Sequence, residues 1–376
     1  MSSCKRVLRK LGLYFLFASC LVTALQAQLF NDPVNYETGG YGPSAVALGD
    51  LNGDHQLDVV VANQATNSIA VLLGNGDGTL RAATTFPAGT SPFFVVLADF
   101  NRDGKLDVAV ANRDVFGIKQ VSILLGDGTG GFQSPVSYGS YRDVFSLAVG
   151  RFRNNGKIDI AIADTASGSL LLGNGDGTFR DGGSIGVEVP LAFAVKDLNH
   201  DRLKDLLGAS NGARTIISLL GNGNGTFTQA WTGAVSTPPI ALALGDFNRD
   251  GFVDVASADE AVNNLGSNVA VFAGRGDGTF GNAMEYAVGT EPRSIAAGRL
   301  NRDGKLDLVT ANSFVGTLSI LLGNGDGSFK PAIDIPSGGS GPSGVVIGDL
   351  NNDGRPDLVV AQPGEAVVSI LLSTGK

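Results

Sequence analysis

Seven short segments of the chain crowd oxygen-bearing side chains into nine residues each. The fifth segment, DFNRDGFVD, places Asp246, Asn248, Asp250 and Asp254 at its first, third, fifth and ninth positions. Two like charges about 4 Å apart repel by roughly 4 kcal/mol at an effective dielectric near 20, so a cation is needed among them. Carboxylate, amide and backbone oxygens in a tight loop are the ligands that Ca²⁺ takes, at about 2.3–2.6 Å. The spacing therefore predicts a calcium loop.

The same segment starts at residues 50, 99, 151, 197, 246, 299 and 349, and the copies are not equivalent. The segments at 99, 246 and 349 keep every ligand, together with a glycine at the sixth position, where a left-handed backbone is needed. The segments at 50 and 197 keep the four ligands but have His55 and Arg202 at the sixth position. We expect these two to bind more weakly, because a side chain strains a left-handed backbone.

The segments at 151 and 299 carry arginine in ligand positions, namely Arg151, Arg153 and Arg299. We expect an arginine there to satisfy the remaining acids without a metal. This leaves three to five Ca²⁺ sites, in which a backbone carbonyl such as that of Phe252 would complete the side-chain set. The candidate ligands are Asp50, Asn52, Asp54 and Asp58; Asp99, Asn101, Asp103 and Asp107; Asp197, Asn199, Asp201 and Asp205; Asp246, Asn248, Asp250 and Asp254; and Asp349, Asn351, Asp353 and Asp357.

The elements that position these residues repeat about every 50 residues. In the first repeat, β-branched runs over 43–51, 57–63, 68–74 and 78–86 alternate with Gly/Asn/Asp turns, which predicts four strands. The second and third runs are apolar on both faces, so each sheet must be covered front and back. Four-stranded sheets of about 50 residues stacked in a ring form a propeller. We therefore predict an all-β fold over residues 28–376, a seven-bladed β-propeller of four-stranded antiparallel blades.

The two ends of the chain indicate how this ring closes. The last repeat stops before its fourth strand, whereas the segment LFNDPVNY (29–36) precedes the first repeat and resembles a fourth strand. We expect this N-terminal strand to complete the seventh blade and so remove an open sheet edge.

The first 27 residues have the composition of an export signal. Four cations and no acid precede an apolar run over 11–25, and VTA and LQA then offer small residues for cleavage. We predict a signal peptide over residues 1–27 and a secreted protein, periplasmic or extracellular. An uncleaved anchor and a lipoprotein acylated at Cys20 are the alternatives.

Charge and cysteine content constrain the mature protein. Loss of residues 1–27 would remove four cations and both cysteines, taking the net charge from −9 to −13. A secreted chain without disulfides needs another source of stability, and bound metal ions can provide it. So acidic a chain disfavours nucleic acid and anionic membrane surfaces as partners. No second long apolar run follows, so we expect no membrane span in the mature chain.

The D-x-N-x-D-G-x-x-D segment, followed about 22 residues later by LLGNGDGTF-like turns, resembles the FG-GAP/VCBS-type repeats of the integrin α-subunit head and of many secreted bacterial proteins. The resemblance covers nearly all of the mature chain. It implies a seven-bladed propeller with Ca²⁺ in the hairpins between the first two strands of certain blades. It says less about activity, since such propellers serve adhesion, sugar binding and some enzymes.

We expect a secreted binding or adhesion module for a glycan or protein partner at the cell surface or outside the cell. A carbohydrate-active, lyase-like enzyme and a structural scaffold in an envelope complex are the alternatives. Residues outside the repeat consensus would form a ligand face opposite the calcium hairpins: Arg113, Asp114, Phe116, Tyr141, Arg142, Asn263 and Asn264. The RGD at 275–277 replaces the NGD of sister turns, so we interpret it as a structural turn.

Overall fold

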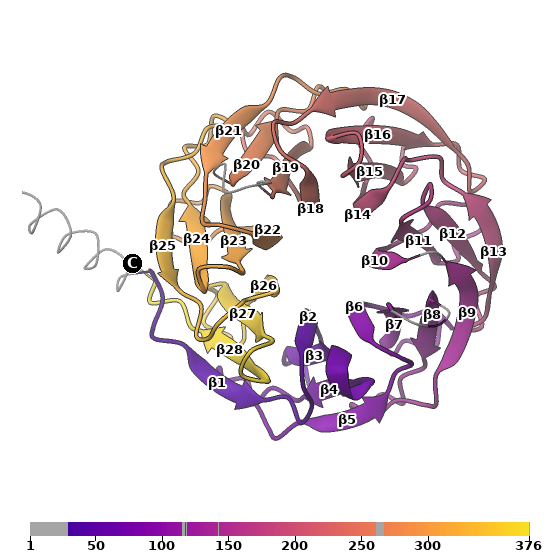
Figure 1. The fold of residues 1–376 in the computed structure, drawn as a ribbon, viewed down its shortest axis with the longest axis vertical. Coiled ribbons are helices and arrows are strands. Elements are labelled where there is room, and N and C mark those ends of the chain that lie inside the picture. The colour runs from indigo at the N-terminus through magenta and orange to yellow at the C-terminus, as the bar shows by residue number, and fades with distance from the viewer. Residues whose placement is uncertain (1–28, 115–116, 118, 142, 261–266, 376) are drawn as a thin grey trace, which may run out of the picture.

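The computed structural model describes residues 29–375, except 115–116, 118, 142 and 261–266. Within these residues, seven antiparallel four-stranded sheets surround a common axis (Figure 1). The predicted all-β, seven-bladed propeller is therefore confirmed. The predicted signal peptide, residues 1–27, lies outside the described residues. In the described part of the chain, no helix has the length and apolar character needed to cross a bilayer.

Each blade runs from the axis to the outer wall in chain order. Blade one comprises β2 (Pro43–Gly49), β3 (Asp58–Asn63), β4 (Ser68–Leu72) and β5 (Thr84–Pro87), with the 3-10 turn η1 (Gln64–Thr66). Blades two and three comprise β6 (Pro92–Ala98), β7 (Asp107–Asn112), β8 (Lys119–Leu124), β9 (Val136–Tyr141), β10 (Val144–Gly150), β11 (Asp159–Asp164), β12 (Ser169–Gly173) and β13 (Phe179–Ser184). Blade four comprises β14 (Pro190–Lys196), β15 (Asp205–Ser210), β16 (Thr215–Gly221) and β17 (Phe227–Ala234).

The remaining blades follow the same plan. Blade five comprises β18 (Pro239–Gly245), β19 (Asp254–Asp259), β20 (Asn268–Phe272) and β21 (Met284–Ala287). Blade six comprises β22 (Pro292–Gly298), β23 (Asp307–Asn312), β24 (Thr317–Leu321) and β25 (Ile333–Pro336). Blade seven comprises β26 (Gly344–Gly348), β27 (Asp357–Gln362), β28 (Val367–Leu371) and the N-terminal β1 (Val34–Glu37).

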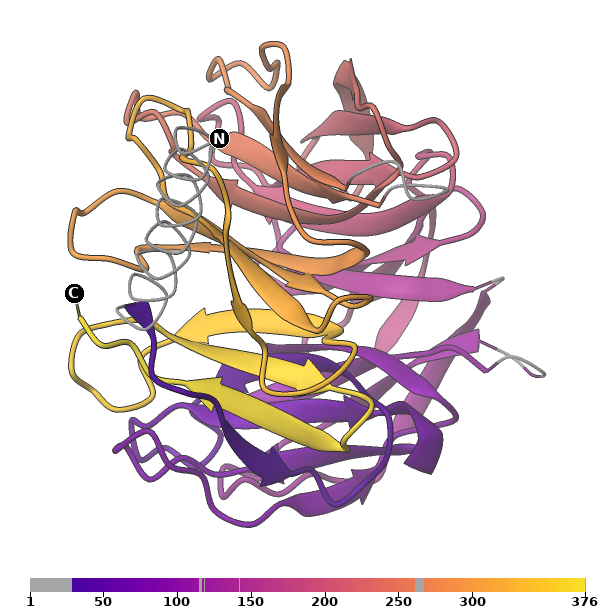
Figure 2. The ribbon, with the colours of Figure 1, turned by 60° about the vertical axis from the view of Figure 1, so that its left-hand side comes forward.

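The N-terminal strand closes the ring as predicted. β1 pairs antiparallel with β28, from Val34 opposite Ile370 to Glu37 opposite Val367. Just before β1, the Asn31 N–H donates to the Leu372 carbonyl at 2.8 Å, and Phe30 forms a bridge with Ser373. Figure 2 shows β1 lying beside β28 on the outer wall. The two ends of the chain thus share one sheet, so the closing contact has no covalent continuity and depends on this pairing.

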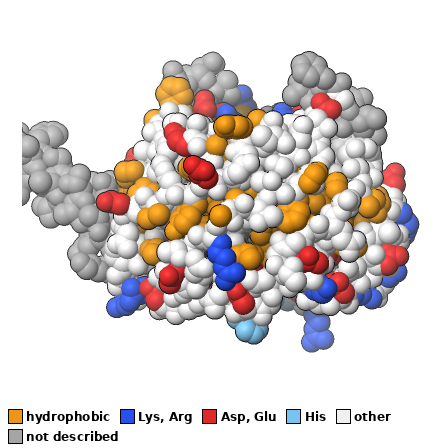
Figure 3. All heavy atoms as spheres, turned by 90° about the horizontal axis from the view of Figure 1, so that it is seen from below, with side chains coloured by type: hydrophobic (Ala, Val, Ile, Leu, Met, Phe, Trp, Pro, Cys, Tyr) orange, Lys and Arg blue, Asp and Glu red, His pale blue; other side chains and the backbone are white. Residues whose placement is uncertain are grey.

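The core lies between neighbouring blades, on both faces of each sheet. Every residue of each second strand is buried, as the apolar runs predicted. Around the axis, small residues let the sheets approach: a Cβ on Gly348 would lie 2.6 Å from Cδ1 of Leu48 in the next blade. On the side seen in Figure 3, apolar side chains form a band across the outer wall, and most of the charged side chains lie toward one rim.

All four strands of blade one are shorter than predicted, and the structure gives a reason for the first and the fourth. The first ends at Gly49 rather than residue 51, because Leu51 turns inward and is buried. The fourth spans Thr84–Pro87 rather than 78–86. Leu80 is buried against blade seven and holds only an isolated bridge with Gly74, so the chain rejoins the ladder four residues later.

Candidate metal centres

The seven acidic hairpins all join the first strand of a blade to its second strand, so they lie on one face of the ring. The turn between the third and fourth strands lies on the same face. In blade one, this second turn touches the hairpin through Asp58, which begins β3 and accepts a hydrogen bond from the Gly74 N–H at 2.8 Å. The fold therefore gathers the predicted ligands of each repeat within their own hairpin and spaces the hairpins around the ring.

The ninth-position acid is buried in every blade and binds backbone N–H groups. In blade one, the Leu51 N–H donates to Oδ2 of Asp58 at 2.9 Å, while Gly74 donates to Oδ1. The same pair of bonds recurs in five other blades, at Asp107, Asp205, Asp254, Asp307 and Asp357. Two backbone donors stabilise a buried carboxylate that would otherwise be costly. The acid thus links two turns of its own blade.

Sequence reasoning assigned this acid to the metal alone and missed its role in linking the turns. One signal was available: the ninth position is the only ligand position that is acidic in all seven repeats, including the two that begin with arginine. A residue that stays acidic even where arginine replaces the first ligand is expected to serve the hairpin itself. Its contribution as a metal ligand in the other five blades stays a prediction.

In the five hairpins that keep all four predicted ligands, the first, third and fifth side chains fold the chain into a compact loop, as blade one shows. Oδ1 of Asp50 accepts from the Gly53 N–H at 2.7 Å, and Oδ2 accepts from the His55 N–H at 2.9 Å. Asn52 accepts from the Asp54 N–H at 2.9 Å, and its amide nitrogen donates to Asp54 Oδ2 at 2.9 Å. These bonds hold three oxygen-bearing side chains close together on an exposed loop.

The backbone distinguishes the five oxygen-rich hairpins from the other two. Their fourth position is left-handed throughout, at Gly53, Arg102, His200, Arg249 and Asn352. The corresponding residues of the hairpins that begin with arginine, Asn154 and Arg302, are not left-handed. The sixth position is left-handed in all seven, with φ of 65° at His55 and 72° at Arg202. The left-handed backbone expected at His55 and Arg202 is therefore present, and this conformation favours glycine.

Burial makes these hairpins attractive to a cation. It raises the pKa of the ninth-position carboxyl, and the negative charges of acids in the same loop raise it further: this applies to Asp58, Asp107, Asp205, Asp254 and Asp357. For Asp307, burial raises the pKa to about 6, and the charge of Asp303 adds to the effect. A bound cation would have the opposite effect: its positive charge would lower the pKa of these carboxyls and favour their charged form.

The donor set fits a hard cation. Each of the five hairpins offers three carboxylates and one amide oxygen, with no nitrogen or sulfur ligand among the predicted positions. In blade four, Oδ1 of Asp197 is buried and has no hydrogen-bond partner among the described residues. The described residues hold no ready group of three or more converging His, Cys, Asp or Glu side chains. An ion would therefore need the amide and backbone oxygens as well, which is how Ca²⁺ is bound in flexible oxygen-lined loops.

In blade three an arginine takes the place of these ligands. Arg153 stands at the third position, and its Nη2 lies 2.5 Å from Oδ1 of Asp159, with Nε at 3.1 Å from Oδ2. Asp159 is 0% exposed and the Arg153 side chain is 13% exposed, so the pair is buried. Arg153 also donates to the Gly173 carbonyl at 2.6 Å. The prediction that arginine satisfies the remaining acid is confirmed here.

In blade six the same prediction is wrong. Arg299 stands at the first position, is exposed, and forms no ion pair with Asp307 within the described residues. Asp303 pairs with Lys305 instead, at 3.6 Å. The difference is positional: a side chain at the third position reaches the buried acid, whereas Arg299 at the first position is exposed and lines a pocket beside hairpin seven.

The proposed ligand face opposite the hairpins is only partly described. Phe116, Arg142, Asn263 and Asn264 lie outside the described residues. Arg113 is held in place: its Nε lies 2.9 Å from Oδ1 of Asp143, and its guanidinium stacks 4.5 Å from the ring centre of Phe145. Asp114 packs beside Gly117, and burial raises the pKa of Tyr141. Arg113 therefore serves the packing between blades two and three.

The RGD turn has the geometry of its sister turns. Oδ1 of Asp277 accepts from the Thr279 N–H at 2.8 Å and from its hydroxyl at 2.6 Å, as Asp77, Asp127 and Asp176 do in their turns. The aspartate is thus held by its own turn. Among the described residues, the two histidines occupy different hairpins, and His200 packs edge-on against Phe252 at 5.7 Å.

The far end of each second strand carries a buried polar residue, which sequence reasoning did not single out. In blade one, the Asn63 amide donates to the Thr38 carbonyl at 3.2 Å, in the loop that enters the blade. In blade seven, the Gln362 amide donates to the Ser337 carbonyl at 2.6 Å, again in the loop that enters the blade. In blade five the residue is Asp259, which is 0% exposed. Burial raises the pKa of Asp259 to about 8.

Comparison with known families identifies the repeat. The model of the family described as FG-GAP-like repeat matches residues 50–110, 197–257, 246–310 and 299–360, more than half of the chain. The arginine-bearing third repeat falls outside these ranges. No curated protein sequence matches the chain.

Solved structures share the fold at low identity. A lectin from Agrocybe aegerita, reported for specific recognition of non-reducing terminal N-acetylglucosamine, is 19% identical, with a TM-score of 0.53 over 79% of this chain and 81% of that chain. The periplasmic gluconolactonase PpgL of Pseudomonas aeruginosa is 14% identical, with a TM-score of 0.61 over 78% and 85%. Virginiamycin B lyase from Staphylococcus aureus is 15% identical, with a TM-score of 0.58 over 91% and 99%. These likenesses establish the propeller fold alone.

Proposed function

This chain belongs to the FG-GAP-like repeat family, and from that premise we propose that it is an exported propeller that binds Ca²⁺ in its hairpins and acts as a binding module for a glycan or protein partner outside the cell. The family and the propeller fold are established. The binding of Ca²⁺, the export of the chain and the binding of a partner are proposed, and each has its own support and test.

One observation carries the metal proposal. Where the hairpin ligands are replaced in blade three, the chain places its own cation, Arg153, on the buried Asp159 at 2.5 Å. Asp107 and Asp254 stand at the same position and are as deeply buried, but no arginine or lysine pairs with them among the described residues. Because a buried carboxylate without a counter-charge is costly, a cation from solution would serve those blades.

In blades two, five and seven, the complete sets of Asp, Asn, Asp and Asp side chains would hold the ion. The sets of blades one and four would hold it more weakly because of His55 and Arg202. When bound, Ca²⁺ would supply positive charge among the acids and bring loop oxygens together. At ten times its dissociation constant, each ion would add about 1.4 kcal/mol to the free energy of unfolding. Three to five ions would be a large part of a typical 5–15 kcal/mol stability.

Binding is better supported than catalysis by the described side chains. A catalytic acid or base needs both a shifted pKa and contact with substrate. Outside the hairpins, burial raises the pKa of Asp259 to about 8, but this side chain is fully buried and cannot touch a ligand. A rigid ring of sheets that presents loops on two faces suits recognition, and the similar Agrocybe aegerita lectin is an example of a sugar-recognising protein with this fold.

A glycan array probed with and without chelator tests this function. We expect binding to a defined glycan class that weakens when EDTA removes Ca²⁺, because the hairpins shape the face on which they lie. Binding to no glycan, together with no captured protein partner from cell-surface extracts, would contradict the binding role. Export is tested separately by expressing the full chain and locating it by cell fractionation, with a variant lacking residues 1–27 as the control.

A further inference from the structure

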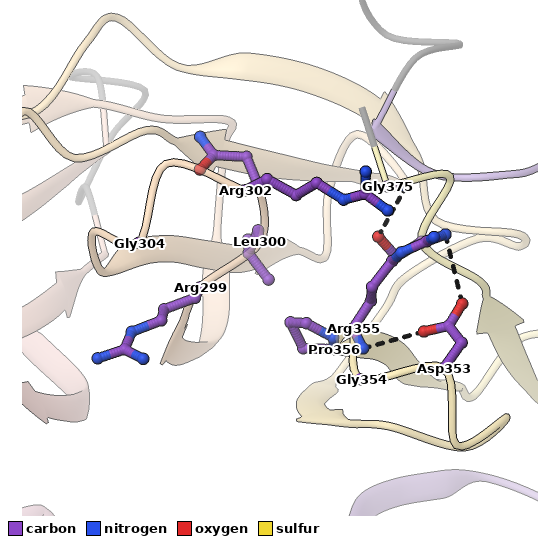
Figure 4. Close-up of a pocket in the computed structure, with 11 residues that line it drawn as sticks. Arg299, Leu300, Arg302, Gly304, Asp353, Gly354, Arg355, Pro356 and Gly375 are labelled. Atoms are coloured by element: carbon purple, nitrogen blue, oxygen red, sulfur yellow. Dashed lines mark hydrogen bonds and ion pairs between the residues drawn. The ribbon is translucent and has the colours of Figure 1, made fainter.

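A pocket of about 470 Å³ lies on the hairpin face between blades six and seven. It is formed by the hairpin over 299–307, the hairpin over 349–357 and the segment over 373–375 (Figure 4). Its charged lining consists of Arg299, Arg302, Arg355 and Asp353. The volume is within the range of about 300–1,000 Å³ typical of small-ligand sites. The pocket is therefore large enough for one or two sugar rings.

The pocket carries excess positive charge on an otherwise acidic chain. Asp353 is already engaged, since its Oδ2 lies 3.4 Å from Nη1 of Arg355 and its Oδ1 accepts from the Arg355 N–H at 2.9 Å. Arg299 and Arg302 have no ion pair or side-chain hydrogen bond among the described residues. Two guanidinium groups are thus left for a ligand, and guanidinium matches the planar oxygens of carboxylate and the oxygens of sulfate or phosphate.

These arginines are available because hairpin six departs from the calcium pattern. Its first position is Arg299 rather than aspartate, so no first-position carboxylate neutralises the loop. Its fourth residue, Arg302, is not left-handed, whereas the fourth-position Arg102 and Arg249 of complete hairpins are. Hairpin six therefore follows a different backbone path, and its Arg302 side chain extends toward Gly375 beside blade seven.

Figure 4 shows that the cations occupy two ends of the pocket. Arg302 and Arg355 extend toward Gly375, while Arg299 extends in the opposite direction. A single small anion could contact only one end. A chain molecule with acidic groups at intervals could contact both, because neighbouring sugar units repeat their charges along the polymer.

We propose that this pocket binds an acidic polysaccharide through the carboxylate or sulfate groups of successive sugar units. The proposal rests on the glycan-binding role above and names the ligand class. The net negative charge of the chain does not prevent this contact, because at physiological salt charges more than about 8 Å apart are largely screened. Local arginines then outweigh distant acids.

The test compares two double variants of the purified protein on three immobilised polymers. Hyaluronan supplies carboxylates, dextran sulfate supplies sulfate esters, and dextran is the neutral control. Arg299→Ala/Arg302→Ala removes the two unpaired arginines of the pocket. Arg102→Ala/Arg151→Ala removes two arginines from hairpins two and three on the same face, outside the pocket. Urea unfolding of both variants confirms that they fold.

We expect the wild type to bind one or both acidic polymers, and binding to one alone identifies the acidic group. Arg299→Ala/Arg302→Ala should weaken this binding by about tenfold or more per arginine. Arg102→Ala/Arg151→Ala should change it by less than about twofold. Equal losses in both variants would overturn the proposal and indicate diffuse attraction. Binding to neutral glycans or a protein partner that Arg299→Ala/Arg302→Ala leaves unchanged would overturn the pocket proposal while keeping the binding role; binding to nothing would contradict both.

Discussion

Replacing Arg153 by alanine removes the internal cation of blade three and leaves Asp159 buried without a counter-charge. Asp159 keeps its bond from the Gly173 N–H at 2.9 Å but loses all three hydrogen bonds from the guanidinium group. The pair is almost fully buried, with side chains 13% and 0% exposed. Removing one partner of a buried ion pair costs about 3–5 kcal/mol. This is a large fraction of a typical domain stability of about 5–15 kcal/mol.

Urea unfolding followed by the fluorescence of Trp231, the single tryptophan of the chain, measures this loss. Trp231 lies in the neighbouring blade four and packs against Phe272 at 5.3 Å, so its emission reports the packing between blades. Arg151→Ala is the matched control, because Arg151 is exposed and has no ion pair among the described residues. It should change the free energy of unfolding by less than about 0.5 kcal/mol. Equal effects of the two substitutions would refute the reasoning.

A rescue experiment links this pair to the metal proposal. The triple substitution Arg151→Asp, Arg153→Asn, Asn155→Asp restores the full ligand pattern to the third hairpin. In EDTA we expect this variant to be at least as unstable as Arg153→Ala, because the cation is gone and acids have been added. In calcium it should regain stability. A variant that is equally stable with and without calcium would show that the ligand pattern does not recruit an ion.

Three other perturbations test separate parts of the structure. Deleting residues 29–38 removes β1 and exposes the edge of β28, so calorimetry should show loss of the single cooperative transition; an unchanged melting curve would refute closure by β1. His55→Gly and Arg202→Gly each remove a side chain from a left-handed backbone position, so each should raise the free energy of unfolding by about 1 kcal/mol and tighten Ca²⁺ binding. Gly354→Ala places a side chain at such a position and should have the opposite effects. Asp259→Asn matches the asparagine of sister blades. Because burial raises the pKa of Asp259 to about 8, the folded wild type binds more protons than the unfolded chain above pH 4, and its stability falls as pH rises toward 8. The variant should lose this slope of up to about 1.4 kcal/mol per pH unit and exceed the wild type at pH 8; parallel pH profiles in urea would count against the assignment.

The sequence predicted the ring well because its signals are local and repeated. The spacing of seven acidic segments determines the number of blades, and the unmatched strand at 29–36 predicts closure. The apolar second strands predict sheets covered on both faces. Each of these inferences needs only the order of residues along the chain.

The finer features of the hairpins depend on contacts that sequence order does not show. The bond between Asp58 and the Gly74 N–H joins residues of two different turns, and the sequence spacing alone gave no reason to pair them. Arg153 and Arg299 are the same residue type in sister hairpins, yet only the one at the third position reaches its buried acid. Arg113 was assigned to a ligand face because it breaks the repeat, whereas its partners Asp143 and Phe145 hold it in the packing between blades.

Calcium stoichiometry measured together with thermal stability tests the central claim most directly. The purified protein is dialysed against calcium, analysed for bound metal, and melted in parallel in excess calcium and in EDTA. We predict three to five calcium ions per chain and a melting temperature that is clearly higher with calcium. A chain that carries no calcium and melts at one temperature in both buffers would contradict the account.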